Sequence, residues 1–222
     1  MVEQVGLARF WGIHPNSVVA IVGSGPSAVR FQPLADVVIA VNGAARLRND
    51  FDYFLCGDRY SFRRDWFEFS CSRVRLIATL VASLDYQLYP QSRFPTLLRL
   101  ALPVERQHEL CLPVPVWPHG VFEYRSFREE LVTRRPQYLL YRGTIACCAV
   151  QLAFAFGSRE IVLFGCEFDH SHGHYFYNSV NVGSIVSSQR RVMERCLALV
   201  RAAGVCVTIF GPTSLAQYDR LL

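Results

Sequence analysis

The sequence has 222 residues, and 51% of them are hydrophobic, which is enough for one domain with a sizeable core. Its formal net charge is +5 and every one of its 23 basic residues is arginine. This charge permits acidic ligands or an anionic membrane surface, but it is too modest and too dispersed to indicate nucleic-acid binding.

The sequence contains neither a membrane span nor a targeting signal that we can identify. No apolar run reaches the roughly 18 residues needed to cross a bilayer, and the N-terminus lacks a charged region followed by an apolar one. Most of the eight cysteines lie in apolar runs and none form a CxxC pair, which indicates small buried side chains in a reducing compartment. We therefore expect a cytoplasmic protein.

Short apolar runs alternate with helical patterns along the chain. Strands are predicted at 17–23, 36–42, 52–58, 73–80, 159–165 and 205–211. A buried helix is predicted at 143–156, ended by Gly157, and another at 187–204, capped by Ser187 or Ser188 and closed by Gly204. A short helix at 213–222 completes the prediction.

This alternation predicts an α/β fold, a single Rossmann-like domain over 1–222 with a mostly parallel sheet that helices cover on both faces. The interval 81–137 breaks the pattern, because it is rich in proline, arginine and aromatic residues and has few clear elements. We interpret it as an irregular insertion, or lid subdomain, over the carboxyl edge of the sheet.

The turn after the first predicted strand reads VGSGPS and is a candidate ligand site. Gly23 and Gly25 allow close approach of a ligand, Ser27 can cap a following helix, and backbone amides there would attract phosphate. The turn matches neither GxGxxG nor a Walker A loop, so a simple tight turn remains the alternative.

Polar residues also follow the next two predicted strands. Asn42 stands where a dinucleotide-binding domain usually has an acidic residue, so it weakens an NAD assignment, and an Asn-Gly turn is the alternative. Asp58 would lie at the carboxyl edge of the sheet, where open α/β sheets bind ligands, unless it only caps a helix.

The stretch GCEFDHSHGHYFY concentrates side chains that can carry chemistry. It holds His170, His172 and His174 between two carboxylates, Glu167 and Asp169, and a tyrosine pair that includes Tyr175. A histidine here can act as a general base at neutral pH, and the HxHxH spacing with Asp169 can also bind zinc. A polar loop whose histidines are structural is the third interpretation.

These motifs resemble the bacterial sialyltransferases of glycosyltransferase family 42. The similarity lies in VGSGPS, Asn42, the block YRGTIACCAVQLAFAFGSREIVLFGCEF, HYFY and IFGPTSL. The motility-associated transferases and the pterin pyrophosphokinase-like proteins of family 115 share the pattern more loosely. The resemblance implies an inverting transfer of a sugar acid from a CMP-activated donor to a glycan acceptor, with neither cofactor nor metal.

The resemblance also implies roles for individual residues. Arg142 falls on a conspicuous arginine of the family, and Tyr175 falls on a tyrosine that binds the departing phosphate. Glu167 replaces an aspartate. The implied donor-binding set is Gly23, Ser24, Gly25, Pro26, Ser27, Asn42, Asp58, Thr144 and Glu167.

Two departures from the family pattern keep other functions open. Asp169 stands where a second phosphate-binding tyrosine is expected, and the stretch before the last long helix lacks the general-base histidine. Either the base has moved to His170, His172 or His174, or the chemistry differs. The alternatives are a pterin pyrophosphokinase, with ATP and Mg²⁺ held by Asp58, Glu167 and Asp169, and a non-catalytic nucleotide-binding module.

The expected partners follow from the resemblance and the charge. They are a nucleotide-sugar donor and a glycan acceptor, and the arginines suit anionic lipopolysaccharide or capsule glycans. The resemblance suggests a homo-oligomer, and the basic charge suits peripheral association with the inner membrane.

Overall fold

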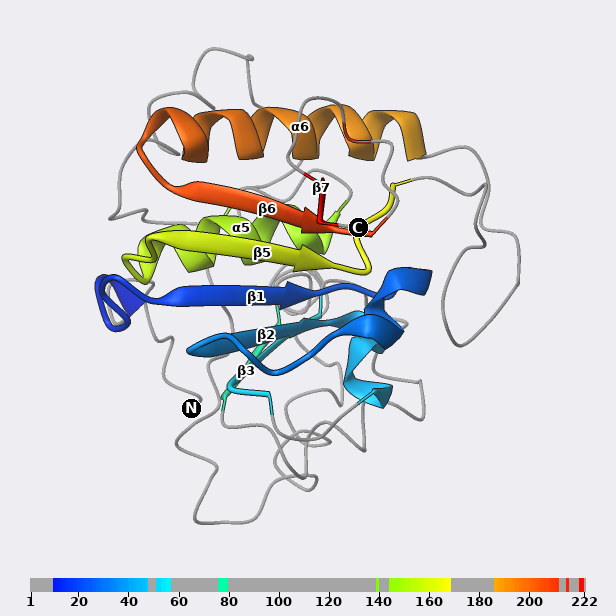
Figure 1. Cartoon of the computed structure of the whole chain (residues 1–222), viewed down its shortest axis with the longest axis horizontal. Helices are drawn as coiled ribbons and strands as arrows, with labels where there is room; N and C mark the ends of the chain where they lie inside the picture. The colour runs from blue at the N-terminus through cyan, green and yellow to red at the C-terminus, as the bar shows by residue number, and fades with distance from the viewer. Residues whose placement is uncertain are drawn as a thin grey trace, which may run out of the picture.

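The computed structural model describes residues 10–47, 51–56, 76–79, 139, 144–168, 186–211, 215 and 220–221. Its centre is a seven-stranded sheet in the order β4-β3-β2-β1-β5-β6-β7, and all neighbouring strands pair in parallel (Figure 1). The strands are β1 (Val18–Val22), β2 (Val37–Val41), β3 (Tyr53–Cys56), β4 (Leu76–Thr79), β5 (Glu160–Phe164), β6 (Cys206–Phe210) and β7 (Arg220–Leu221). The predicted α/β fold with a parallel sheet is confirmed.

The strand order changes direction between β1 and β5. From β1 the chain moves outward through β2, β3 and β4, and it then returns to place β5 on the other side of β1. Such a reversal leaves the loops after the two central strands on opposite faces, and open α/β sheets bind ligands at this point. The arrowheads of β1, β5 and β6 end at the same edge in Figure 1.

One face of the sheet is covered by two packed α-helices, α5 (Ile145–Ala155) and α6 (Val186–Ala202). All eleven residues of α5 are buried, as its apolar sequence predicts. The buried stripe of α6 comprises Met193, Cys196, Leu197 and Val200. Gly157 and Gly204, both with positive φ, follow the helices as predicted.

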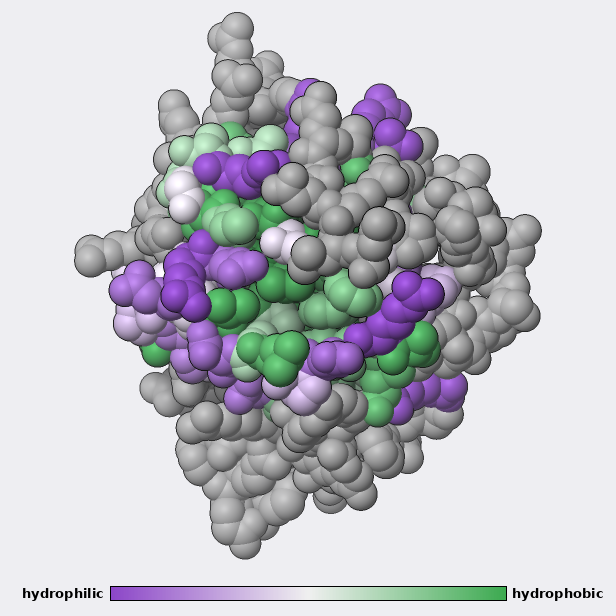
Figure 2. Space-filling view, viewed as in Figure 1, coloured by the Kyte–Doolittle hydropathy of each residue, from purple (hydrophilic) through white to green (hydrophobic). Residues whose placement is uncertain are grey.

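The opposite face was also predicted to be covered by helices. In the described part of the chain it carries two short 3₁₀ helices, η2 (Pro26–Arg30) and η3 (Asn42–Arg46). A second cluster of small and aromatic side chains, including Ala20, Ala40 and Phe164, packs beneath them. Figure 2 shows apolar atoms across the middle of the face that is turned toward the viewer.

Two predictions about secondary structure are wrong, and a third lies outside the described residues. The predicted final helix is wrong at Arg220–Leu221, which form β7 beside β6. The predicted serine cap of α6 is also wrong, because α6 begins at Val186, before both serines. The predicted lid, 81–137, lies outside the described residues.

Among the residues that the structure describes, no helix is long and apolar enough to cross a bilayer.

The amino edge of the sheet is closed by an aromatic cluster. A hydrogen bond of 2.6 Å joins His14 Nε2 to the Tyr53 hydroxyl, and both rings pack edge-on or tilted against Phe156. Phe10 is buried against the rings of Tyr53 and Phe156. This edge lies opposite the carboxyl ends of the strands, so its role is to hold the segment before β1 against β3 and the end of α5.

We expect Tyr53→Phe to lower the free energy of unfolding by about 1 kcal/mol, because it removes one partly buried hydrogen bond and little else. Urea denaturation measures the effect. The control is Val29→Ala at a side chain that is 62% exposed, where the change should stay within about 0.5 kcal/mol. A Tyr53→Phe protein as stable as the wild type would show that the hydrogen bond contributes nothing.

Candidate functional site at the carboxyl edge of the sheet

Three neighbouring strands, β1, β5 and β6, each end at a glycine: Gly23, Gly165 and Gly211. Gly165 has φ of +64° and Gly211 has φ of +90°, which other L-residues rarely adopt. The Gly23 amide donates to the Phe164 carbonyl at 2.7 Å, and the Gly25 amide donates to the Gly165 carbonyl at 2.9 Å. The two loops therefore run against each other with no space for a side chain between them.

Ser27, which lies in η2 after β1, bridges the ends of β5 and β6 through its hydroxyl group. Its Oγ accepts a hydrogen bond from the Gly165 amide at 2.9 Å and donates to the Phe210 carbonyl at 3.2 Å. A Cβ on Gly211 would lie 2.7 Å from the Ser27 Cβ, so this glycine is also required by packing. The predicted capping role is wrong, because Ser27 lies inside η2 and the residue before the helix is Gly25.

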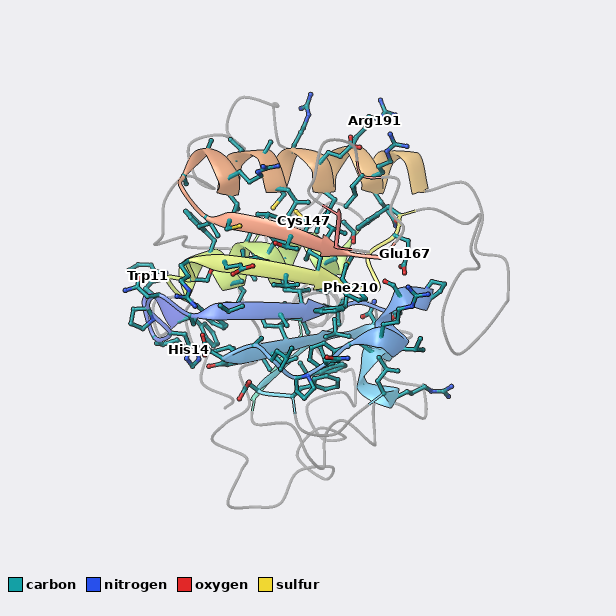
Figure 3. The ribbon with its side chains drawn as sticks, in the orientation of Figure 1. Trp11, His14, Cys147, Glu167, Arg191 and Phe210 are labelled. Carbon is teal, nitrogen blue, oxygen red and sulfur yellow. The ribbon has the colours of Figure 1, made fainter. Side chains whose placement is uncertain are left out.

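The Glu167 carboxylate lies on the turn that precedes η2. Oε1 accepts the Ser27 amide at 2.5 Å, and a Cβ on Gly25 would overlap the carboxylate. The residue is only 3% exposed although it is charged. Figure 3 shows Glu167 beyond the end of β5, beside the coil of η2 and away from His14 and Trp11 at the other edge. The predicted proximity of Glu167 to the turn is confirmed, and the contact is direct.

Ser24 and Asn42 lie on the β2 side of the same turn. Ser24 Oγ donates to the Val41 carbonyl at 3.3 Å, so it links the turn to the end of β2. Asn42 follows with φ of +50°, a conformation that asparagine tolerates better than most residues. Its Oδ1 is buried and has no hydrogen-bond partner among the described residues. Asn42 also begins η3, so the alternative interpretation of an Asn-Gly turn fits the local backbone.

Phe168 and Thr144 each border, in the sequence, a stretch of predicted site residues that lies outside the described residues. Phe168, directly after Glu167, has φ of +50°, which is rare for a bulky side chain and turns the backbone sharply before the histidine-rich stretch. Thr144 stands in an extended conformation before α5, and its side chain makes no capping hydrogen bond.

Cys166 lies beneath the turn, and it was not among the predicted site residues. Its side chain is 5% exposed, and a Cβ on Gly23 would approach its Sγ to 3.0 Å. Burial raises the pKa of the Cys166 thiol well above its usual range, and the negative charge of Glu167 raises it further. The thiol is therefore neutral and serves as packing, not as a nucleophile.

Several predicted site residues lie outside the described residues. They are Asp58, Arg142, Asp169, His170, His172, His174 and Tyr175. No group of three or more metal-binding side chains occurs among the residues that the structure describes. The metal interpretation of the HxHxH stretch, and its interpretation as a source of the base, both stay predictions.

Sequence reasoning missed Gly165, Gly211 and the Phe210 carbonyl as parts of the site. A signal for the two glycines was present, because the apolar runs VAIVG, IVLFG and VTIFG all end in glycine. Three strands that end in this way at one sheet edge indicate loops that pack closely together.

Comparison with known proteins identifies a similar fold. No family model matches the sequence, and no curated protein matches it. The structure of the sialyltransferase CstII from Campylobacter jejuni in complex with cytidine-5'-monophosphate is similar at 14% identity, with a TM-score of 0.50, over 88% of this chain and 80% of that one. The same enzyme with CMP-3FNeuAc gives 15% identity and a TM-score of 0.46, over 87% and 80%.

We expect Gly25→Ala to destabilise the protein, because the new Cβ would overlap the Glu167 carboxylate and break its bond to Ser27. The loss should be about 1–3 kcal/mol in urea denaturation, the usual range for an overpacked buried site. Combining it with Glu167→Ala should recover part of this loss, because the smaller side chain makes room. Additive effects of the two changes would contradict the contact.

Proposed function

We propose that this protein is a sialyltransferase-like glycosyltransferase, which transfers a sugar acid from a CMP-activated donor to a glycan acceptor with inversion. The observation that carries the proposal is the convergence of the GSGPS turn, Asn42 and Glu167 at the switch point of the sheet. These three elements come from the ends of β1, β2 and β5, which are far apart in the sequence.

The fold supports a nucleotide at this edge. The similar CstII structure contains cytidine-5'-monophosphate, and a parallel sheet with this strand order binds ligands beyond the carboxyl ends of its central strands. In our proposal the nucleoside lies against Ser24 and Asn42, which follow the ends of β1 and β2. Thr144 would complete the contact from the start of α5.

The chemistry is assigned to residues outside the described part of the chain. The acceptor hydroxyl attacks the anomeric carbon, the bond from this carbon to the phosphate oxygen breaks, and CMP leaves. Tyr175 and Arg142 would stabilise the departing phosphate. One of His170, His172 and His174 would take the acceptor's proton, since imidazole titrates near neutral pH. The reaction needs no metal, and the acceptor would be an anionic surface glycan such as lipopolysaccharide.

A test of donor binding uses Asn42. We expect the wild type to bind CMP without Mg²⁺, and Asn42→Gly to bind it about tenfold more weakly, the loss expected for one or two hydrogen bonds. Glycine keeps the positive φ, so the variant removes the side chain without straining the backbone. Isothermal titration calorimetry measures both affinities.

The matched control is Asn16→Gly, since Asn16 also has positive φ but lies exposed at the amino edge of the sheet. It should leave CMP affinity unchanged. Wild-type affinity in Asn42→Gly would remove Asn42 from the site. A strict requirement for ATP and Mg²⁺, with no CMP binding, would reject the proposed function and favour the pyrophosphokinase alternative.

A second test concerns the base. We expect His174→Ala to lose at least about a hundredfold in transfer from CMP-sialic acid, the usual contribution of a positioned base, while it retains CMP affinity. Unchanged turnover would exclude His174, and His170 and His172 would then be compared in the same assay. Retained CMP binding with no turnover in the wild type would support the non-catalytic alternative.

A further inference from the structure

Most amides of the GSGPS turn are not available to a phosphate, although the sequence suggests that they should be. The amides of Gly23, Gly25 and Ala28 donate to the carbonyls of Phe164, Gly165 and Gly25 at 2.7–3.0 Å. The Ser27 amide donates to Glu167, and Pro26 has no N–H group. η2 is a 3₁₀ helix of only five residues, so its dipole is weak. Only the Ser24 amide has no acceptor among the described residues, so the protein itself closes most of the expected phosphate cradle.

The group that closes it is a buried negative charge. The Glu167 carboxylate covers Gly25 from the side of β5 and is 3% exposed, so water screens it poorly. Phosphate oxygens at this turn would meet a like charge at short range.

We propose that Glu167 is a specificity-determining residue that excludes phosphate from the turn, because its carboxylate binds the Ser27 amide and covers Gly25. The inference rests on the proposed function for the identity of the nucleotide. It adds that the phosphate of the donor binds away from the turn. Each further phosphate on the ligand brings more negative charge toward Glu167, so nucleoside monophosphates are favoured over diphosphates and triphosphates.

The experiment compares cytidine, CMP, CDP and CTP by calorimetry without metal. The wild type should bind CDP and CTP no more tightly than CMP. Glu167→Gln keeps an oxygen that accepts the Ser27 amide but removes the charge, so CTP affinity should rise by about tenfold relative to cytidine. The control is Glu194→Gln, which removes one negative charge from the partly exposed pair with Arg190 on α6 and should change CTP affinity less than about twofold.

A second measurement separates this inference from the proposed function. Inorganic tripolyphosphate should leave the melting temperature of the wild type unchanged and raise that of Glu167→Gln, whether or not either protein binds a cytidine nucleotide. Absence of CMP binding alone would therefore reject only the proposed function.

If Glu167→Gln does not fold, the wild-type series still tests the inference. Metal-free binding of CTP that is at least about tenfold tighter than that of CMP would overturn it. Tighter CTP binding that needs both Mg²⁺ and Glu167 also overturns it, since Glu167 would then be a metal ligand.

Discussion

The carboxyl edge of this sheet depends on Ser27, which forms hydrogen bonds through both its hydroxyl group and its backbone amide. Its hydroxyl group bridges the ends of β5 and β6, and its amide is held by Glu167, which follows β5. These contacts satisfy polar backbone groups that would otherwise be buried without partners at three converging loops, which is costly. They also fix the turn after β1 in one position, so the neighbouring Ser24 and Asn42 are held in place before any ligand binds. Binding at a preformed site avoids the entropy cost of ordering loops.

The sheet could be predicted from the sequence because each strand is a short apolar run bounded by polar residues or glycine. The run at 17–23 became Val18–Val22, and the run at 205–211 became Cys206–Phe210. Continuous apolar character is dictated by burial on both faces, and it depends on no distant partner. The helix at Ile145–Ala155 was predictable for the same reason, since burial on every side leaves an unbroken apolar sequence.

The contacts of the site could not be predicted because they join residues far apart in the chain. Ser27 and Glu167 are separated by 140 positions, and nothing local to either residue identifies the other. Sequence reasoning therefore assigned Ser27 to a helix cap, a role defined by its near neighbours. The short 3₁₀ helices were missed for a related reason: PSAVR and NGAAR are too brief to show helical periodicity. The final strand, Arg220–Leu221, is specified mainly by its pairing with β6.

A glycine-rich turn is usually taken as evidence for phosphate binding, but the physical property that binds phosphate is the set of free amides, not the glycines. In this protein Gly23 and Gly25 are required because backbone and carboxylate approach too closely for any side chain. Of the amides that such a turn exposes elsewhere, those of Gly23, Gly25 and Ser27 are here bonded to carbonyls or to Glu167. The same sequence pattern thus supports opposite ligand preferences, depending on whether the adjacent strand end supplies an anion. In our proposal Glu167, which lies in the loop after β5, decides between them, so the specificity of the turn after β1 is encoded outside the turn itself.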